Sequence, residues 1–459
     1  MAAHTHSLPT VDEDQLARLD RNAPRYTSYP TAPTWQEDFT CADHSDALAQ
    51  AARRSGPLSL YLHIPFCREM CSYCGCNVVV SRSSERAGRY VDMLAAELVL
   101  LGRALVGRRQ LARVHLGGGT PTFLDEAQLE RLWHAVLAAG FEVAPDAELA
   151  IEIDPAVTRA SQIQLLAQLG FNRVSFGVQD LDPDVQAAVN RVQSIDETAA
   201  AVASARAAGF SSVNFDLIYG LPRQRPETWA KTLAEVIAMA PDRLAVYSFA
   251  YLPDLRPNQR RLPAVDIPTG AAKLTLFRMA HELLTDAGYQ AIGMDHFARP
   301  DDELARARRE RRLWRDFQGY SVRRATDTVA AGASGIATLD EAIVQAPRSL
   351  GKWAEAVRTG RLPTERGIRL DADDRRRRDV IVQLMCNDWV DLGADGEEYF
   401  AAELERLRAH QAEGLCVVSG TEITLTPLGR TFSRVCASVF DTYLPASPDE
   451  RRERFSRTV

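Results

Sequence analysis

The chain has 459 residues, of which 46% are hydrophobic and 25% charged, and its formal net charge is −7. This composition is typical of a globular protein and excludes a disordered or fibrous chain. The negative charge gives no reason to expect a nucleic-acid partner, and no apolar run approaches the roughly 20 residues of a membrane-spanning helix. Because the first residues lack the basic and apolar regions of a signal peptide, we expect a cytoplasmic protein without a membrane span.

The first 55 residues are polar, contain prolines and show only weak periodicity. We expect residues 1–55 to form an arm that packs on the following domain, not a domain of its own. The sequence PRYTSYPT at residues 24–31 supplies aromatic side chains that could cover the mouth of that domain.

Six short β-branched or aromatic segments alternate with amphipathic segments over the next two hundred residues or so. The predicted strands are residues 58–64, 113–116, 149–153, 173–178, 213–218 and 244–249. The predicted helices between them are residues 86–101, 126–137, 160–169, 196–208 and 227–239. This alternation predicts a parallel sheet of the α/β class, and six units predict an open, partial (βα)6 barrel over residues 56–300. Ligand sites are expected at the carboxyl ends of such strands.

The last part of the chain shows a different pattern. Residues 301–365 are expected to extend the barrel and connect it to residues 366–459. Helices are predicted at residues 374–386 and 398–411, followed by two short strands around Ser419 and Gly420 and a helix from Pro427 onward. We expect a small, mostly helical, winged-helix-like domain with a lid or docking role, because fold alone does not establish DNA binding.

Four of the eight cysteines lie within ten residues, directly after the first predicted strand, in YLHIPFCREMCSYCGCN. Cys67, Cys71 and Cys74 have C-x3-C-x2-C spacing, which lets one loop present three thiolates to an iron-sulfur core and leaves one metal position open. A zinc site would want four ligands in paired C-x2-C motifs, and buried free cysteines rarely cluster in this way. Disulfides are disfavoured by the geometry of so tight a loop. The remaining cysteines, Cys41, Cys386, Cys416 and Cys436, are interpreted as buried or incidental thiols.

The cysteine loop resembles that of the radical S-adenosylmethionine (radical SAM) superfamily. Within it, HIPFC and YCGCN are similar to the oxygen-independent coproporphyrinogen III oxidases, and so are PRYTSYPT, GGGTPT, SFGVQD, DLIYGLP, GMDHFARPDDEL, FQGY and FDTYL. The resemblance implies that Cys67, Cys71 and Cys74 hold a [4Fe-4S] cluster whose open iron binds SAM. Cys76 receives no cluster role and is interpreted as a loop or substrate-side residue.

Glycines after the second predicted strand let backbone amides approach a ligand closely. By resemblance, Gly118, Gly119 and Thr120 belong to the motif that recognises the amino group of SAM. Glu152 closes the third strand, where a carboxylate can accept hydrogen bonds from ribose hydroxyls. On the strand alone, an ion-paired structural glutamate is equally consistent with the pattern.

The resemblance also implies a second SAM molecule in each subunit. The matching positions are Gln179, Arg191 and Asp216, with Ala250 and Ile336 as backbone or apolar contacts. By the same resemblance Tyr61 is an essential, catalytic tyrosine near SAM, although strand packing is its alternative role. Tyr73 is expected to provide an aromatic platform beside adenine.

The implied substrate, coproporphyrinogen III, carries four propionates, so some arginines must face the cavity. Arg25 and Arg299 are the candidates, and both could equally be structural ion-pair partners. The implied reaction turns two propionates into vinyl groups through a 5′-deoxyadenosyl radical, giving protoporphyrinogen IX in haem biosynthesis. A donor such as flavodoxin or ferredoxin would supply electrons, and a monomer is expected. The alternatives are a haem-trafficking protein and a radical SAM methyltransferase.

Overall fold

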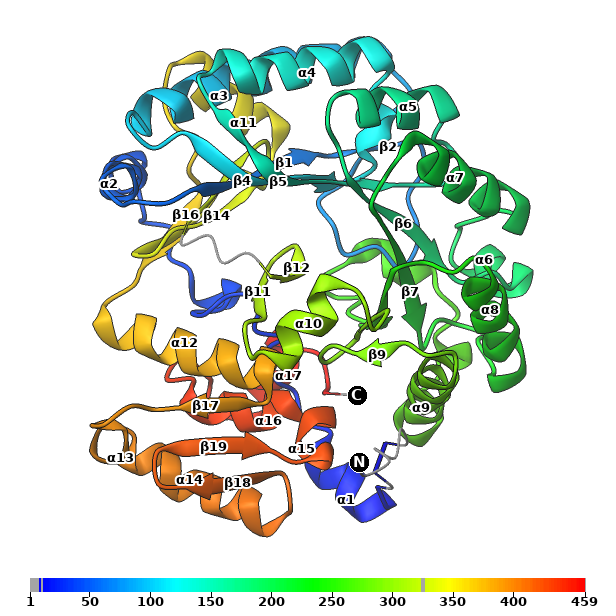
Figure 1. Cartoon of the computed structure of the whole chain (residues 1–459), viewed down its shortest axis with the longest axis vertical. Helices are drawn as coiled ribbons and strands as arrows, with labels where there is room; N and C mark the ends of the chain where they lie inside the picture. The colour runs from blue at the N-terminus through cyan, green and yellow to red at the C-terminus, as the bar shows by residue number, and fades with distance from the viewer. Residues whose placement is uncertain (1–7, 10, 323–326, 459) are drawn as a thin grey trace.

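A twelve-stranded sheet forms the centre of the protein in the computed structural model, which describes residues 8–9, 11–322 and 327–458 (Figure 1). The six predicted strands lie side by side in chain order, each parallel to the next. They are β1 (Leu58–Ile64), β4 (Gln110–Gly118), β5 (Glu142–Ile153), β6 (Arg173–Gln179), β7 (Ser212–Tyr219) and β8 (Arg243–Ser248). This sequential order is that of a barrel.

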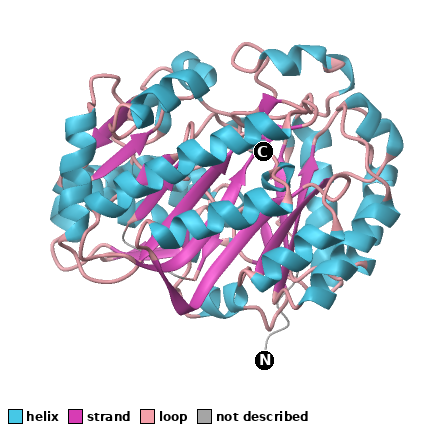
Figure 2. Ribbon diagram, turned by 90° about the horizontal axis from the view of Figure 1, so that it is seen from above, coloured by secondary structure: helices cyan, strands magenta, loops and turns pink. Residues whose placement is uncertain are grey.

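Helices connect these strands and cover the outer face of the sheet (Figure 2). They are α3 (Ser84–Ala104), α4 (Glu126–Ala138), α5 (Ala160–Gln168), α6 (Pro183–Ala188), α7 (Ile195–Ala208) and α8 (Pro226–Ala238). The sequence predicted all of them except the short α6. Ser83, Asp125 and Ser194 cap α3, α4 and α7 by accepting backbone N–H bonds, as side chains at helix N-termini commonly do.

The two faces of the parallel strands differ in chemistry. Outward side chains such as Val114, Leu149 and Val174 are buried under the helices. Their neighbours Arg113 and Glu148 point into the lumen of the barrel, since successive side chains of a strand alternate between faces. The lumen is therefore polar, and the hydrophobic core lies between sheet and helices.

Both edges of the parallel sheet are extended by strands that the sequence did not predict. β13 (Thr328–Ala331) runs parallel to β1, and β14 (Ile336–Thr338), β15 (Ala342–Gln345) and β16 (Arg366–Arg369) follow antiparallel. At the other edge β10 (His296–Ala298) and β9 (Gln290–Ala291) are also antiparallel. No pairing within the described residues joins β16 to β9, so the predicted α/β class and open, partial barrel are confirmed.

Several shorter elements lie between these strands. α9 (Gly270–Asp286) packs against α8, and α11 (Leu350–Arg358) packs against α3. α10 (Glu303–Arg309) and the hairpin of β11 (Trp314–Asp316) and β12 (Gly319–Ser321) lie on the concave side of the sheet (Figure 1).

The N-terminal residues pack against the C-terminal elements. After α1 (Glu13–Leu19), the Tyr26 hydroxyl donates to Asp441 over 3.1 Å, and Tyr29 lies 3.0 Å from the hydroxyl of Thr442. Tyr26 and Tyr29 belong to the hydrophobic core of the C-terminal elements. α2 (Cys41–Ala52) instead packs on α3. The arm is therefore divided between the two ends of the molecule.

The C-terminal elements contain the predicted helices and strand pair. The helices are α12 (Ala372–Asn387), α13 (Gly396–Tyr399), α14 (Ala401–Ala412), α15 (Pro427–Thr431), α16 (Ser433–Ala437) and α17 (Pro448–Arg454). The strands β18 (Cys416–Ser419) and β19 (Glu422–Leu425) pair as expected, and β17 (Trp389–Asp391) adds an unpredicted third strand. No helix among the described residues has the length and apolar character needed to cross a membrane.

Candidate active site

The cysteine loop leaves the carboxyl end of β1 and is held by a short helix that follows β8. Phe66 and Cys67 form β2, which pairs with β3 (Val79–Val80). From the 3-10 helix η3 (Pro257–Arg261), the Asn258 amide donates to the carbonyls of Cys71, Ser72 and Cys74 over 3.3, 3.1 and 2.9 Å. Three bonds from one side chain fix the backbone between the second and third predicted ligands. The sequence does not predict this clamp, because a lone Asn in a loop carries no recognisable signal.

The three thiols lie in different electrostatic surroundings. Burial raises the pKa of Cys67 to about 11 and also raises that of Cys71. A hydrogen bond from Cys76 lowers the pKa of Cys74 to about 7. The thiols are close enough to influence one another, but within the described residues they do not form a compact set that would hold a single ion. A four-iron cluster binds each thiolate on a different iron, so its ligands lie farther apart, and this donor set fits such a cluster.

The glycine segment after β4 lies against both the cysteine loop and Glu152. Gly118 has φ +117°, and its N–H donates to the Glu152 carboxylate over 3.2 Å. A Cβ on Gly119 would lie 2.7 Å from the Phe66 carbonyl oxygen, so no larger residue fits there. The Thr120 hydroxyl is 3.5 Å from the Cys67 sulfur.

A row of aromatic and imidazole side chains connects Tyr61 to Glu152. The Tyr61 hydroxyl is 3.0 Å from His63 Nδ1, and its ring stacks on His115 with centroids 5.9 Å apart. His115 Nε2 is 3.0 Å from the Glu152 carboxylate. Burial would raise the pKa of Glu152, but the hydrogen bonds from His115 and Gly118 lower it below its ordinary value. His63 and His115 were missed by the sequence analysis, although their alternation with apolar residues in β1 and β4 was a usable signal.

Arg191 and Gln179 lie next to the cysteine loop. The Arg191 guanidinium pairs with Asp154 at 2.8 Å and donates to the Gly177 carbonyl over 2.7 Å. Gln179 has φ +65°, and its amide lies near Gly177 and Arg191. Arg191 also lines a cavity of about 660 Å³ that reaches Cys67, Cys71 and Thr120. This cavity brings predicted cluster and cofactor residues together.

Asp216 lies deeper, in a lumen cavity of about 100 Å³ that Glu152 also lines. Its carboxylate accepts hydrogen bonds from Ser175 over 2.7 Å and from Asn214 over 3.0 Å. Burial raises the pKa of Asp216 to about 7, and these two donors only partly oppose that rise.

The other predicted residues are distributed around this centre. Tyr73 packs on the apolar cluster of Val185, Leu221 and Phe249, and the carbonyl of Ala250 accepts from Gln259 over 3.0 Å. Ile336 begins β14 and packs beside Trp35. Arg25 pairs with Asp295 and lies over the ring of Tyr247, at the carboxyl end of β8.

Arg299 is the one candidate that the structure does not bring to this site. Its side chain is exposed, and its backbone N–H bonds to the carbonyl of Asp242, just before β8 begins. It therefore lies at the opposite end of β8 from the cysteine loop.

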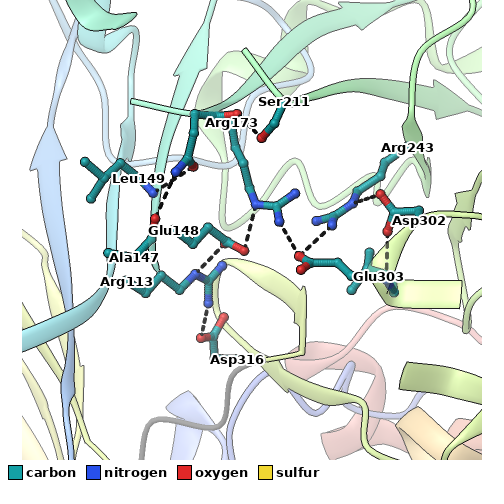
Figure 3. A network of polar contacts seen from close by, with 12 residues as sticks. Arg113, Ala147, Glu148, Leu149, Arg173, Ser211, Arg243, Asp302, Glu303 and Asp316 are labelled. Carbon is teal, nitrogen blue, oxygen red and sulfur yellow. Dashed lines mark hydrogen bonds and ion pairs between the residues drawn. The ribbon is translucent and has the colours of Figure 1, made fainter. Parts of the chain in front are cut away.

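The amino end of the lumen is filled by a network of ion pairs (Figure 3). Glu148 pairs with Arg113 at 3.1 Å and with Arg173 at 2.9 Å. The network continues through Arg113 to Asp316 of β11, through Arg173 to Glu303, and through Arg243 to Asp302 and Glu303. These side chains satisfy one another and close the floor of the lumen.

The chain is similar to known proteins over nearly its whole length. Residues 61–236 match the family model of the radical SAM superfamily. The chain is 41% identical over 457 residues to the oxygen-independent coproporphyrinogen III oxidase of Pseudomonas aeruginosa, covering 98% of each protein. It is 42% identical over 452 residues to the protein of the same name from Salmonella typhimurium, covering 97% of each. The solved coproporphyrinogen III oxidase of Escherichia coli superposes with a TM-score of 0.88 at 42% identity, covering 92% of this chain and 98% of that one.

Proposed function

The chain belongs to the oxygen-independent coproporphyrinogen III oxidases of the radical SAM superfamily, and from this premise we propose how its residues share the reaction. The enzyme is an oxidoreductase of haem biosynthesis that converts two propionates of coproporphyrinogen III to vinyl groups. When bound, its [4Fe-4S] cluster and SAM supply a 5′-deoxyadenosyl radical that abstracts hydrogen from a propionate.

The observation that carries the assignment is the convergence of the cysteine loop, the glycine segment and Glu152. Thr120 contacts the Cys67 sulfur, and Gly118 donates to Glu152, so ligand loop and strand ends form one continuous wall. In our proposal Cys67, Cys71 and Cys74 hold the cluster. Gly118, Gly119 and Thr120 then face the amino group of SAM, and Glu152 accepts from its ribose hydroxyls.

Tyr61 is proposed as the catalytic tyrosine beside SAM. Burial raises the pKa of Tyr61 well above its ordinary value, so its hydroxyl stays protonated near neutral pH. His63 lies within hydrogen-bond distance of the hydroxyl and His115 stacks on the ring, so the two imidazoles hold the side chain in place. Tyr73 is proposed as the aromatic wall for adenine.

A second SAM molecule is proposed beside the first. Gln179, Arg191 and Asp216 would supply its polar contacts, and Ala250 and Ile336 its backbone and apolar contacts. The support is that Arg191 lines the same cavity as Cys67 and Cys71, while Asp216 and Glu152 line the lumen cavity together.

The setting of the enzyme also belongs to the proposal. A monomer in the cytoplasm would receive electrons from a small donor such as flavodoxin or ferredoxin. The eight cysteines all lie in the described part of the chain and are free thiols, which suits a reducing compartment. Residues 1–55 and 366–459 would shield the cavity from water.

The decisive test is turnover by the reconstituted enzyme under anaerobic conditions. Coproporphyrinogen III, SAM and a reductant are supplied, and 5′-deoxyadenosine and porphyrin products are quantified. We expect two deoxyadenosines for each divinyl product, and no cleavage of SAM by a Cys71→Ala variant. Deoxyadenosine without vinyl product would reject the substrate. Intact cluster without SAM cleavage would favour a haem-trafficking role, which a haem titration would then check.

A further inference from the structure

A second, smaller polar cavity lies outside the lumen, where the N-terminal arm, the carboxyl ends of β7 and β8, and helices α15 and α16 meet. Its volume is about 20 Å³, and its wall includes Arg25, Tyr219, Asp295, Thr431 and Arg434. By the same measure a single water needs about 10–15 Å³. The cavity therefore accommodates one small polar group.

Arg434 lies in the wall of this cavity without an acidic partner. The residue is only 2% exposed, and no carboxylate among the described residues lies within ion-pair distance of it. Its N–H groups bond to the backbone carbonyls of Ala23, Pro24, Ser456 and Arg457, and more weakly to the Ser456 hydroxyl. Carbonyl oxygens satisfy its donors but leave its full charge uncompensated, which is costly in a buried position.

The one carboxylate in the wall is already engaged. Asp295 pairs with Arg25 and accepts a hydrogen bond from His296 Nδ1 over 2.6 Å. A third cation, Lys273, lies 5.8 Å from the centroid of the Tyr219 ring, just behind the wall. Two cations, Arg25 and Arg434, thus line a space with one carboxylate in its wall, and Lys273, which donates to the Phe249 carbonyl over 2.7 Å, lies close behind it.

Two further observations indicate that a group is expected in this space. The hydroxyl oxygen of Thr431 is buried in the cavity wall and has no hydrogen-bond partner among the described residues, whereas nearly all buried polar atoms are paired. Burial lowers the pKa of Lys273 to about 8 despite the attraction of Asp20, and burial together with the neighbouring Arg25 lowers the pKa of Arg434 to about 9. An anion placed here would relieve this repulsion.

We propose that this cavity binds a single carboxylate group, which accepts a hydrogen bond from Thr431 and is attracted by the uncompensated charge of Arg434, with further positive charge from Lys273. The carboxylate comes either from a propionate of the substrate or from a free small acid. A substrate propionate as the source rests on the proposed function, whereas the binding of a carboxylate in this cavity does not.

The test uses cluster-loaded protein kept under anaerobic conditions. Sodium propionate is titrated at constant ionic strength against sodium gluconate, whose anion is too large for the cavity, and the thermal unfolding midpoint is followed. We expect a saturable rise in the midpoint. Thr431→Val weakens the apparent propionate affinity by about tenfold, for the loss of one hydrogen bond to a charged group, and Lys273→Met weakens it by a smaller factor, for the loss of a nearby charge. Lys231→Met, which changes an exposed lysine of α8, is the matched control and responds as the unmodified protein does.

A flat or unsaturable titration overturns the proposal, and so does an unchanged response in both variants. Stabilisation by phosphate but not by propionate overturns the assignment of the ligand as a carboxylate. Coproporphyrin III, a stable oxidised relative of the substrate, separates the two sources. If it abolishes the propionate response, a substrate propionate occupies the cavity, and if the response persists, the substrate is overturned as the source. Because this assay needs no SAM cleavage, its failure is distinct from failure of the proposed reaction.

Discussion

Charged side chains line both ends of the barrel lumen, but only at one end are they available to bind a ligand. At the amino end Glu148 is held between Arg113 and Arg173, and every charge has a charged partner. Toward the carboxyl end Glu152 and Asp216 accept hydrogen bonds from His115, Ser175 and other uncharged or weakly basic donors, and no Arg or Lys of the described residues pairs with either. The first arrangement closes a floor, and the second leaves a site for ligands.

The acidities of the carboxyl groups show the same contrast. Burial raises the pKa of a carboxyl group at both ends, because a charge is poorly solvated there. For Glu148 the attraction of Arg113 and Arg173 outweighs burial and lowers the pKa to about 2. For Asp216 burial dominates, and the pKa rises to about 7. The presence of a charged partner, and not the depth of burial, therefore decides whether a carboxyl group in the lumen is ionised.

Removal of the Glu148 charge should have the largest effect on the contrast between the two ends of the lumen. Glu148→Gln keeps the shape of the side chain but leaves Arg113 and Arg173 buried without their shared carboxylate. We expect the free energy of unfolding to fall by about 3–5 kcal/mol, measured by urea denaturation. Glu85→Gln, which removes an exposed pair with Arg89, is the control and should cost less than about 1 kcal/mol. Equal losses in the two variants would contradict a special role for the closed floor.

Glu152→Gln tests the open end of the lumen. The variant should lose the hydrogen bonds that the ribose hydroxyls of SAM donate to a charged carboxylate, which weakens SAM binding by about ten- to a hundredfold, while the unfolding midpoint changes little. Equilibrium binding of SAM to the cluster-loaded protein measures the effect. Glu142→Gln, at the exposed start of the same strand, should bind SAM normally. Unchanged affinity in Glu152→Gln would remove this residue from the site.

Much of this architecture could be predicted from the sequence, because strongly periodic segments specify their own structure. β1 spans the predicted residues 58–64. Each of the other five parallel strands extends beyond its predicted range by one to seven residues at one end or both, and β8 also ends one residue earlier than predicted. Strands of two to four residues, such as β9 and β13 to β16, are too short to show alternation, so their pairing depends on tertiary contacts.

The site could be predicted only in part. The cysteine spacing and the resemblance predicted the loop, the glycines and Glu152 as site residues, and the structure brings these residues together because they lie at the ends of neighbouring strands. Asn258 comes from a 3-10 helix nearly two hundred residues away from the cysteines, and nothing local marks it as their clamp. Arg25 and Arg299 looked alike as arginines within family motifs, and only the fold separates them by placing them at opposite ends of β8.

The pH dependence of stability tests the same contrast at Asp216. Because its folded pKa is raised, the folded state holds a proton that the unfolded state releases, so its contribution to stability is present below about pH 4 and is lost as pH rises through about 7. In protein without SAM, Asp216→Asn should flatten the fall in the free energy of unfolding, measured by urea denaturation, between pH 5 and pH 8 by an amount on the order of 1 kcal/mol or more. Glu148, with its pKa of about 2, contributes no slope in this range. An unchanged slope in the variant would show that Asp216 is ionised throughout.

The smallest effect is expected at Arg299, and its value lies in the contrast with Arg25. Arg25 lies over Tyr247 at the carboxyl end of β8, whereas the exposed Arg299 follows β10 at the amino end. Arg25→Ala should raise the substrate KM by about ten- to a hundredfold, since a charge-assisted hydrogen bond to a propionate contributes about 1.5–3 kcal/mol. Arg299→Ala should change KM less than about twofold, as surface substitutions usually shift free energies by about 0.5 kcal/mol or less. A KM effect at Arg299 alone would mean that substrate reaches the amino end of the lumen, which the ion-paired floor should prevent.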